Sequence, residues 1–401
     1  MTNRVFITGI GIISAVGNNV VQVLHSLRNS ISGIGDITLL DTVYKNILPI
    51  AEVKLTNDQL IKMSGTPHPL KHSRTSLLAL IAAREAIQNA GLNMKDNFRT
   101  GLISATSVGG MDKSEQFYRD FYKDHSKGRL AMIVNHECAD STEKIAAELG
   151  INRFVSTIST ACSSSANSLM FGARLIKNNI LDRVIAGGTD AVTRFTLNGF
   201  NSLMILDKDG CKPFDEHRNG LTLGEGAGFL VIESEEVVQR TGKKVLAELT
   251  GYGNACDAFH QTASSPEGNG AYLAMKKALE VSGFNPDQID YINVHGTGTQ
   301  NNDLSEGKAI ERIFGTKIPP FSSTKAFTGH TLGAAGGIEA VLSVLSINHE
   351  LIFPNLNFSQ QMKELPFKPV THLMTHVKLR NVLSNSFGFG GNNTALIISK
   401  A

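Results

Sequence analysis

The 401-residue chain contains no tryptophan, only four cysteines and no strong excess of charge of either sign. Its 38 lysine and arginine residues nearly balance 36 aspartate and glutamate residues, giving a formal net charge of +2. A near-neutral chain lacks the strongly basic face that nucleic-acid binding requires, so any anionic partner must be met by a local patch. Four cysteines without a close Cys-x-x-Cys pair predict neither a disulfide framework nor a zinc site.

Long apolar runs are also missing. The stretch LLALIAA at 77–83 is far shorter than the ~20 residues that cross a bilayer. The beginning, MTNRVFITGIGIIS, enters a strand-like run without the charged region, apolar core and cleavage site of a signal peptide. Together with the low cysteine content, these features predict a cytoplasmic protein that contacts neither membrane nor nucleic acid.

Short β-rich runs alternate with longer helical runs along the chain, as in RVFITGIGI followed by a helical segment near 18–28. This alternation predicts an α/β protein whose sheets are covered by helices on both faces. A glycine-rich turn precedes an apolar strand twice, in GEGAGFLVIES at 224–234 and GFGGNNTALIIS at 388–399. This repeated pattern is explained by two similar halves that meet near 240–246. It is explained equally well by the glycine turns that are common in α/β folds.

The stretch STACSSSA at 159–166 stands between a strand-like segment and a helical one. A thiol at the start of a helix faces the positive end of the helix dipole, which lowers the pKa of the thiol and favours a nucleophilic thiolate. Taken alone, this context fits both a nucleophile at Cys162 and an inert buried cysteine. Cys138, Cys211 and Cys256 have no comparable setting and are interpreted as structural.

A histidine follows an apolar strand in YINVHGTGTQNND. The glycines after it predict a sharp turn, which puts His295 at the carboxyl end of the strand, where ligands bind in open α/β sheets. Thr297 and Thr299 have hydroxyls that can bond a polar substrate arm. A purely structural role in the turn explains the same residues.

Further on, SSTKAFTGHTLGAAGG carries Lys325 and His330 five residues apart. A lysine near a histidine in a dry pocket supplies fixed positive charge where negative charge develops, although a solvated lysine and a capping histidine are the common explanations.

The last motif, NSFGFGGNN, places Phe387 and Phe389 among glycines. Such glycines let backbone N–H groups approach a ligand and form an oxyanion hole, or make a movable gate; ordinary core aromatics remain the alternative.

In chain order, TAC, NVHGTGT, SSTKAFTGH, LGAAGG and NSFGFGG closely resemble the condensing β-ketoacyl-[acyl carrier protein] synthases of the thiolase superfamily, in their elongating type. The resemblance runs nearly end to end and includes CKPFDEHRNGLTLGEGAGFLVIE. It implies a thiolase-like five-layered α-β-α-β-α fold of two similar halves. The half at 1–244 then carries the nucleophilic cysteine, and the half at 245–401 carries the catalytic histidines and lysine.

Carried over residue by residue, the resemblance makes Cys162 the nucleophile that accepts an acyl chain from a carrier-protein thioester. His295 and His330 bind the malonyl thioester and promote its decarboxylation, and Lys325 supports the second histidine. The backbone N–H groups of Cys162 and Phe389 form the oxyanion hole, and Phe389 is also the gate.

The remaining positions that the resemblance assigns hold the substrate or organise the site. Thr297, Thr299 and Phe387 contact the substrate, the threonines through its phosphopantetheine arm, whereas Asp303, Glu306 and Glu339 are supporting acids. The resemblance implies no metal and no redox cofactor, because oriented donors stabilise the carbanion and the helix end stabilises the thiolate. It also implies an acyl carrier protein as partner, and a homodimer.

Three rivals belong to other classes. A degradative thiolase needs a second reactive cysteine near the C-terminus, and none follows Cys256. An inactive partner subunit of the chain-length-factor kind lacks the nucleophile, whereas Cys162 is present. A cysteine hydrolase would hydrolyse thioesters without condensing them.

The pathway is left open by the sequence. TACSSSA and HGTGT are closer to polyketide synthases, whereas fatty-acid enzymes often read TACATG or TACASG and HGTST. Fatty-acid elongation is the first hypothesis, and a ketosynthase of a type II polyketide or aryl-polyene pathway is the second. The latter could work as a heterodimer with a cysteine-less, chain-length-factor-like subunit.

An acidic carrier protein requires a local basic patch on this near-neutral chain. Two groups of residues are the candidates for it: Lys71, His72 and Arg74, and Lys123, Lys127 and Arg129. Ordinary solvated side chains are the alternative for each.

Overall fold

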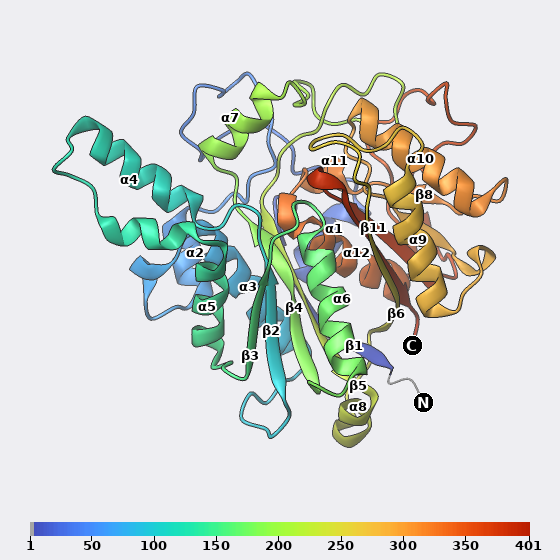
Figure 1. Cartoon of the computed structure of the whole chain (residues 1–401), viewed down its shortest axis with the longest axis horizontal. Helices are drawn as coiled ribbons and strands as arrows, with labels where there is room; N and C mark the ends of the chain where they lie inside the picture. Colours follow the sequence, from blue (N-terminus) through green and yellow to red (C-terminus); the bar gives the residue numbers. More distant parts are fainter. Residues whose placement is uncertain (1–3) are drawn as a thin grey trace.

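The structure, a computed structural model, describes residues 4–401 and is built around one ten-stranded sheet (Figure 1). Its order is β3-β2-β4-β5-β1-β6-β12-β11-β7-β8. The strands are β1 Val5–Ser14, β2 Thr100–Ala105, β3 Phe154–Ile158, β4 Arg183–Asp190, β5 Gly226–Ser234, β6 Ala247–Cys256, β7 Tyr291–Asn293, β8 Phe321–Ser322, β11 Asn381–Phe387 and β12 Asn392–Ser399. A separate pair joins β9 Leu351–Ile352 to β10 Met374–Thr375.

The sheet consists of two halves with the same topology. From the centre outward, each half holds its first strand in chain order, then its fifth, fourth, second and third: β1-β5-β4-β2-β3 and β6-β12-β11-β7-β8. The outer three strands of each half run parallel, and the two halves join where β1 pairs antiparallel with β6. The two glycine-rich turns seen in the sequence precede β5 and β12, which are equivalent strands of this repeat.

Helices cover both faces of each half-sheet and complete five layers. α3 Arg74–Asn89 and α5 Cys138–Leu149 lie on the outer face of the first half, and α9 Asn269–Ser282 and α10 Gln300–Phe314 lie on the outer face of the second. Between the halves lie α6 Ser164–Lys177 and α12 Ala335–His349. The thiolase-like α/β prediction is therefore confirmed.

The position of α6 and α12 between two sheets explains why these helices consist of apolar and small residues. Every residue of α12 from Ala335 to Ile347 is buried, because a helix between two sheets needs an apolar or small surface all round. The same holds at the start of α6, where small residues allow close packing against α12: a Cβ added at Gly336 would lie 2.8 Å from Ala166.

The remaining helices lie at the edges and ends of these layers. They are α1 Val20–Arg28, α2 Asn57–Ser64, α4 Met111–Lys123, α7 Arg194–Ser202, α8 Glu235–Thr241 and α11 Lys325–Thr328, with 3₁₀ turns at Pro69–Lys71, Leu130–His136, Pro286–Gln288, Leu332–Ala334 and Phe389–Gly391. In Figure 1, α4 projects from the side of the molecule. Across residues 4–401, no helix combines the length and apolar character of a membrane span.

The predicted boundary between 244 and 245 falls between α8 and β6. It stays a prediction, and residues 1–3 of the N-terminal half lie outside the described part of the chain. The parallel strands of both halves end toward the same region of the molecule. Cys162 follows β3, His295 follows β7, Lys325 follows β8 and Phe389 follows β11, as expected where carboxyl ends of parallel strands gather loops around a site.

Candidate active site

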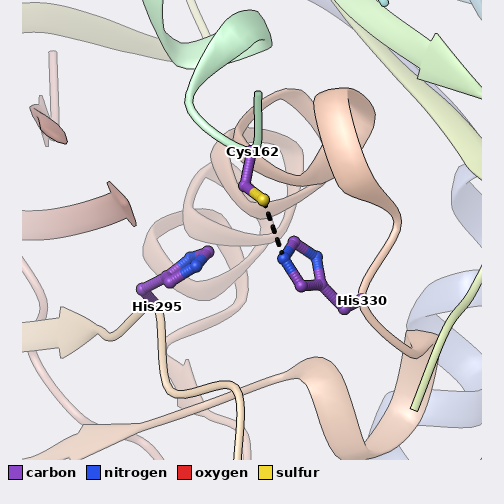
Figure 2. Close-up of side chains that lie close together, drawn as sticks. All are labelled: Cys162, His295 and His330. Carbon is purple, nitrogen blue, oxygen red and sulfur yellow. Dashed lines mark hydrogen bonds between the residues drawn. The ribbon is translucent and has the colours of Figure 1, made fainter. Parts of the chain in front are cut away.

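Cys162 stands on a tight turn between β3 and α6. Ala161 has a left-handed backbone with φ of 51°, and α6 begins at Ser164, so the cysteine lies just before the helix rather than in it. Its side chain is buried, and its sulfur lies 3.1 Å from Nε2 of His330 (Figure 2). The strained turn thus aims the thiol away from the helix axis and toward the second half of the protein.

The three serines after Cys162 brace this turn in three directions. Ser164 Oγ accepts the N–H of Thr160 at 2.8 Å and donates to the carbonyl of Ala161 at 2.5 Å. Ser165 Oγ accepts the N–H of Gly337 in α12 at 2.7 Å. Ser163 Oγ donates to Oδ1 of Asn392, next to the Phe389 loop, at 2.8 Å. All three serines are fully buried, so their bonds fix the nucleophile turn to its neighbours.

The prediction that the helix start lowers the pKa of the Cys162 thiol is wrong. Burial raises its pKa to about 12, more than the charge of Lys325 and the backbone N–H of Phe389 lower it. Desolvation penalises the thiolate more strongly than the helix end stabilises it. The proton must therefore leave during thioester attack rather than before it.

His330 presents a hydrogen-bond donor to the sulfur. Its Nδ1 accepts the N–H of Leu332 at 3.3 Å, which leaves the proton of the neutral ring on Nε2. Burial and the charge of Lys325 lower the pKa of His330 well below its usual value, so the ring is neutral at pH 7. Nε2–H points at Sγ and at any oxygen that replaces it.

His295 faces the Cys162 sulfur from the loop after β7, in the same half of the chain as His330. Its ring lies 5.3 Å from that of His330, nearly perpendicular to it, and 5.8 Å from that of Phe387. Burial, Lys325 and His330 lower its pKa well below the usual value. Within residues 4–401, its buried Nδ1 has no hydrogen-bond partner, so this ring can bond a ligand without losing a protein contact.

Two carboxylates of α10 hold the loop that carries His295. Glu306 accepts the backbone N–H groups of His295 and Gly296 at 2.9 and 2.8 Å, and Asp303 accepts the N–H of Thr297 at 3.0 Å. Gly296 and Gly298 have left-handed φ of 37° and 82°, as the sharp turn requires. Burial raises the pKa of both carboxyls, that of Glu306 to about 7.

Lys325 forms a fully buried ion pair with Glu339. Burial raises the pKa of Glu339 against the opposing effect of the lysine. The lysine charge lowers the pKa of both histidines and of Cys162. Lys325 thus acts on the cluster through its field while its own bond goes to the carboxylate.

A cavity of about 330 Å³ opens onto these side chains. Its lining includes all the residues predicted to touch substrate, namely Cys162, His295, His330, Thr297, Thr299, Phe387 and Phe389. The hydroxyls of Thr297 and Thr299 lie 2.9 Å apart on one wall. The ring of Phe389 stacks on that of Phe200 with 5.9 Å between centroids, and Gly390 beside it has φ of 77°.

Cys162, His295 and His330 also form a possible set of metal ligands, with their ligand atoms within 4.8 Å of one another. Zinc binds the lone pair of an imidazole nitrogen whose ring partner carries the proton. In His330 the Leu332 N–H occupies Nδ1 and the proton sits on Nε2. This tautomer suits donation to an oxygen or sulfur better than metal binding.

One buried residue of the site was missed by the sequence reasoning. Asp190, at the end of β4, accepts the N–H of Gly333 at 2.7 Å and of Val108 at 3.0 Å, and it also bonds Thr106. Burial raises its pKa to about 6. It ties the loop after β2 to the segment after His330. The available signal was an acid directly after the apolar run RVIAGGT.

The first predicted basic patch is largely wrong. His72 is 2% exposed, and the Arg74 guanidinium lies on Glu225 at 2.5 Å while it also bonds the carbonyls of Val53 and Leu55. This half-buried arginine and its carboxylate link the start of α3 to the residue before β5. In the second group, Lys123, Lys127 and Arg129 are exposed.

A buried thiol that faces two neutral imidazoles, between similar halves of a five-layered fold, defines the class of thiolase-like condensing enzymes. Comparison with family models gives the family. A model described as the β-ketoacyl synthase N-terminal domain matches residues 2–237, and its C-terminal counterpart matches 246–359. The chain belongs to the β-ketoacyl synthase family, a family of condensing acyltransferases.

Relatives match over the full length. A protein of Staphylococcus aureus (strain N315) named 3-oxoacyl-[acyl-carrier-protein] synthase 2 is 35% identical over 410 residues, 99% of this chain and 98% of the relative. Nodulation protein E of Rhizobium meliloti (strain 1021) is 33% identical over 99% of both chains.

Two solved structures show the same fold. The ishigamide ketosynthase/chain length factor has a TM-score of 0.94 and 32% identity over 100% of both chains. A ketosynthase from Xenorhabdus doucetiae, in complex with its chain length factor, has a TM-score of 0.85 and 32% identity over 100% of this chain and 98% of that one.

Proposed function

We propose that the protein catalyses decarboxylative Claisen condensation of a cysteine-bound acyl group with malonyl-[acyl carrier protein], giving a β-ketoacyl-[acyl carrier protein] in fatty-acid elongation. The observation that carries the proposal is the 3.1 Å approach of the Cys162 sulfur to the protonated Nε2 of His330, inside a cavity also lined by His295. The full-length similarity to 3-oxoacyl-[acyl-carrier-protein] synthase 2 supports the substrate class.

In the first half-reaction, Sγ of Cys162 attacks the thioester carbonyl of the acyl carrier. A carbon–sulfur bond forms at Cys162, the bond to the carrier's thiol breaks, and the cysteine proton passes to the departing thiolate. The backbone N–H groups of Cys162 and Phe389 stabilise the negative oxygen of the tetrahedral intermediate. The effect of the Phe389 N–H on the thiol supports this position, because the same donor reaches the sulfur.

In the second half-reaction, His295 and His330 donate hydrogen bonds to the malonyl thioester oxygen. The bond to the carboxylate breaks, carbon dioxide leaves, and the electron pair forms an enolate that the two donors stabilise. The enolate carbon then attacks the acyl-cysteine carbonyl, the carbon–sulfur bond to Cys162 breaks as the new carbon–carbon bond is completed, and the released thiolate takes up a proton from water. Lys325 adds positive charge to the site, and Thr297 and Thr299 bind the phosphopantetheine arm.

Acyl transfer and decarboxylation can be measured separately. We expect C162A to abolish transfer of a labelled acyl group from its carrier to the protein. C162Q should abolish condensation and leave malonyl decarboxylation measurable, because the histidines remain. Acyl transfer by C162A at the wild-type rate would overturn the proposed nucleophile, and thioester hydrolysis without condensed product would favour a hydrolase.

A second candidate function is the ketosynthase step of a type II polyketide or aryl-polyene pathway. It is favoured by the TM-score of 0.94 to the ishigamide ketosynthase/chain length factor and by the likeness to a ketosynthase solved with its chain length factor. In that pathway the partner would be a heterodimeric, cysteine-less subunit; in fatty-acid elongation it would be a second copy of this chain. Turnover with saturated acyl carriers by the isolated protein supports elongation, and turnover that needs polyunsaturated carriers and a second subunit supports the alternative.

The carrier protein, the subunit organisation and the compartment are parts of the same proposal. Exposed Lys71, Lys123, Lys127 and Arg129 are the remaining candidates for carrier docking. The free state of all four cysteines supports a reducing compartment, the cytoplasm. Charge reversal at these four basic residues should weaken carrier-dependent turnover at low salt, and unchanged turnover would exclude them as the docking surface.

A further inference from the structure

The two donors of the proposed oxyanion hole come from opposite halves of the chain. Cys162 precedes α6 and Phe389 precedes β12. Their segments nevertheless approach closely, since a Cβ added at Gly388 would lie 3.0 Å from the carbonyl oxygen of Thr160 and 3.2 Å from the backbone nitrogen of Cys162. The N–H groups of Cys162 and Phe389 can stabilise the same oxygen only if the protein holds them at a fixed distance from each other.

The half-buried side chain of Asn392 connects the two segments. The side-chain oxygen Oδ1 of Asn392 accepts the amide of Asn167 at 2.9 Å and lies 2.8 Å from the hydroxyl of Ser163, whose one proton is shared between Asn392 and the carbonyl of Thr160 at 2.7 Å. Ser163 is 0% exposed and Asn167 is 6% exposed. Asn254 of β6 donates to the same oxygen at 2.8 Å. One side chain from the second half therefore gathers donors from the nucleophile turn and from α6.

Asn392 is also the base of the loop that carries Phe389. The backbone N–H of Gly388 donates to the carbonyl of Asn392 at 2.9 Å, and the N–H of Gly391 donates to the carbonyl of Gly388 at 3.1 Å. The loop is thus closed on itself by backbone bonds, and a shift of Asn392 moves Phe389 with it. A further hydrogen bond holds α6 in place, because Thr394 of β12 donates to Oδ1 of Asn167 at 2.7 Å.

We propose that Ser163 and Asn392 are positioning residues that set the distance between the two oxyanion donors, the N–H groups of Cys162 and Phe389. The inference rests on the proposed function, which assigns those donors. Ser163 is the covalent neighbour of Cys162, and Asn392 closes the Phe389 loop, so their hydrogen bond links the two halves of the hole directly. Without this bond the Ser163 hydroxyl still donates to Thr160, but the nucleophile turn loses its direct side-chain contact with Asn392, so the two donors can move apart.

The test separates two reactions of the same sulfur. Acyl transfer from an acyl carrier builds a negative oxygen and needs the hole, whereas alkylation by iodoacetamide builds none at a carbonyl and needs only the nucleophile. We expect S163A and N392A to lower kcat for acyl transfer about tenfold or more, with KM for the acyl carrier and the alkylation rate of Cys162 close to wild type. The exposed Cys256 and the half-buried Cys138 are replaced by alanine in all variants so that alkylation reports Cys162.

The matched control is S168A. Ser168 is a fully buried serine of α6, and its hydroxyl lies 2.8 Å from the carbonyls of both Gly187 and Ser165 and does not contact the Phe389 loop. S168A should lower Tm as S163A does while it leaves kcat for acyl transfer near wild type. Equal loss of acyl transfer in S168A and S163A would overturn the proposal, and so would equal loss of alkylation and acyl transfer in S163A.

S163A alone carries the test if N392A folds poorly, and where both fold, a double-variant cycle asks whether the two residues act through the same bond. The S163A/N392A protein should lose no more acyl transfer than the worse single variant, because one bond is broken in both. Independent, multiplicative losses would show that the two residues act separately and would overturn the link. The proposed function fails by a different result, namely acyl transfer that persists in C162A.

Discussion

Nε2 of His330 lies 3.1 Å from the sulfur of Cys162, while Nδ1 of the same ring accepts the N–H of Leu332. The imidazole is thereby fixed as a donor toward the point where the thiol reacts. Burial raises the pKa of the thiol to about 12, and burial with Lys325 lowers the pKa of the ring. The resting pair is neutral, and charge develops only when substrate brings an electrophile to the sulfur.

Alkylation of Cys162 should therefore rise continuously with pH through pH 9. A thiol whose folded pKa is about 12 is almost wholly protonated at pH 7, and its thiolate fraction increases tenfold per pH unit until about 12. The measurement is the iodoacetamide rate between pH 7 and 10 in a C138A/C256A background, which removes the two accessible cysteines. A plateau below pH 8 would contradict the raised pKa.

Replacement of either histidine by alanine should impair decarboxylation of malonyl-[acyl carrier protein] more than acylation of Cys162. Loss of one preorganised donor to a developing negative oxygen costs about 10²- to 10³-fold in rate. Carbon dioxide release and labelling of Cys162 are followed separately for H295A and H330A. A larger effect on labelling than on carbon dioxide release would reverse the proposed roles.

Removal of Lys325 should destabilise the protein more than removal of both members of its ion pair. Lys325 and Glu339 are 1% and 2% exposed, so K325M leaves a buried carboxylate without its counter-charge. Breaking one side of a buried pair costs roughly 3–5 kcal/mol, whereas an apolar pair of similar volume is often nearly neutral. Urea unfolding of K325M and K325M/E339L compares the two, and equal stability would argue against a desolvated pair.

Glu306 should make stability depend on pH in a defined window. Its folded pKa of about 7 lies above the ordinary value of 4.5, so the unfolded chain releases this proton first as pH rises. The contribution of Glu306 to the free energy of unfolding is fully present below about pH 4.5 and is lost as the pH rises to about 7. The free energy of unfolding of wild type minus that of E306Q should fall across this window and stay level above it.

The sequence identified most of the site because its residues stand in short motifs at strand ends. STACSSSA, NVHGTGT and SSTKAFTGH each follow a parallel strand, and strand-end loops converge wherever such sheets form. Asp190 escaped notice because a lone acid after a strand has no spacing partner, and its partners Thr106 and Gly333 are distant in the chain. His72 and Arg74 were misassigned because a basic residue before a helix looks solvated until its carboxylate partner is known.

The sequence by itself determined the α/β class, the family motifs and the identity of the cluster of Cys162, His295, Lys325 and His330. These features are local, because periodicity and strand-end motifs depend on neighbouring residues. Only the tertiary structure decided the protonation state of the thiol, the tautomer of His330 and the task of the serines. Each depends on burial and on donors from segments far away in the chain, as in the bond from Ser163 to Asn392. Desolvation and long-range hydrogen bonds exist only after folding, so the same motif allowed a thiolate and the folded site holds a thiol.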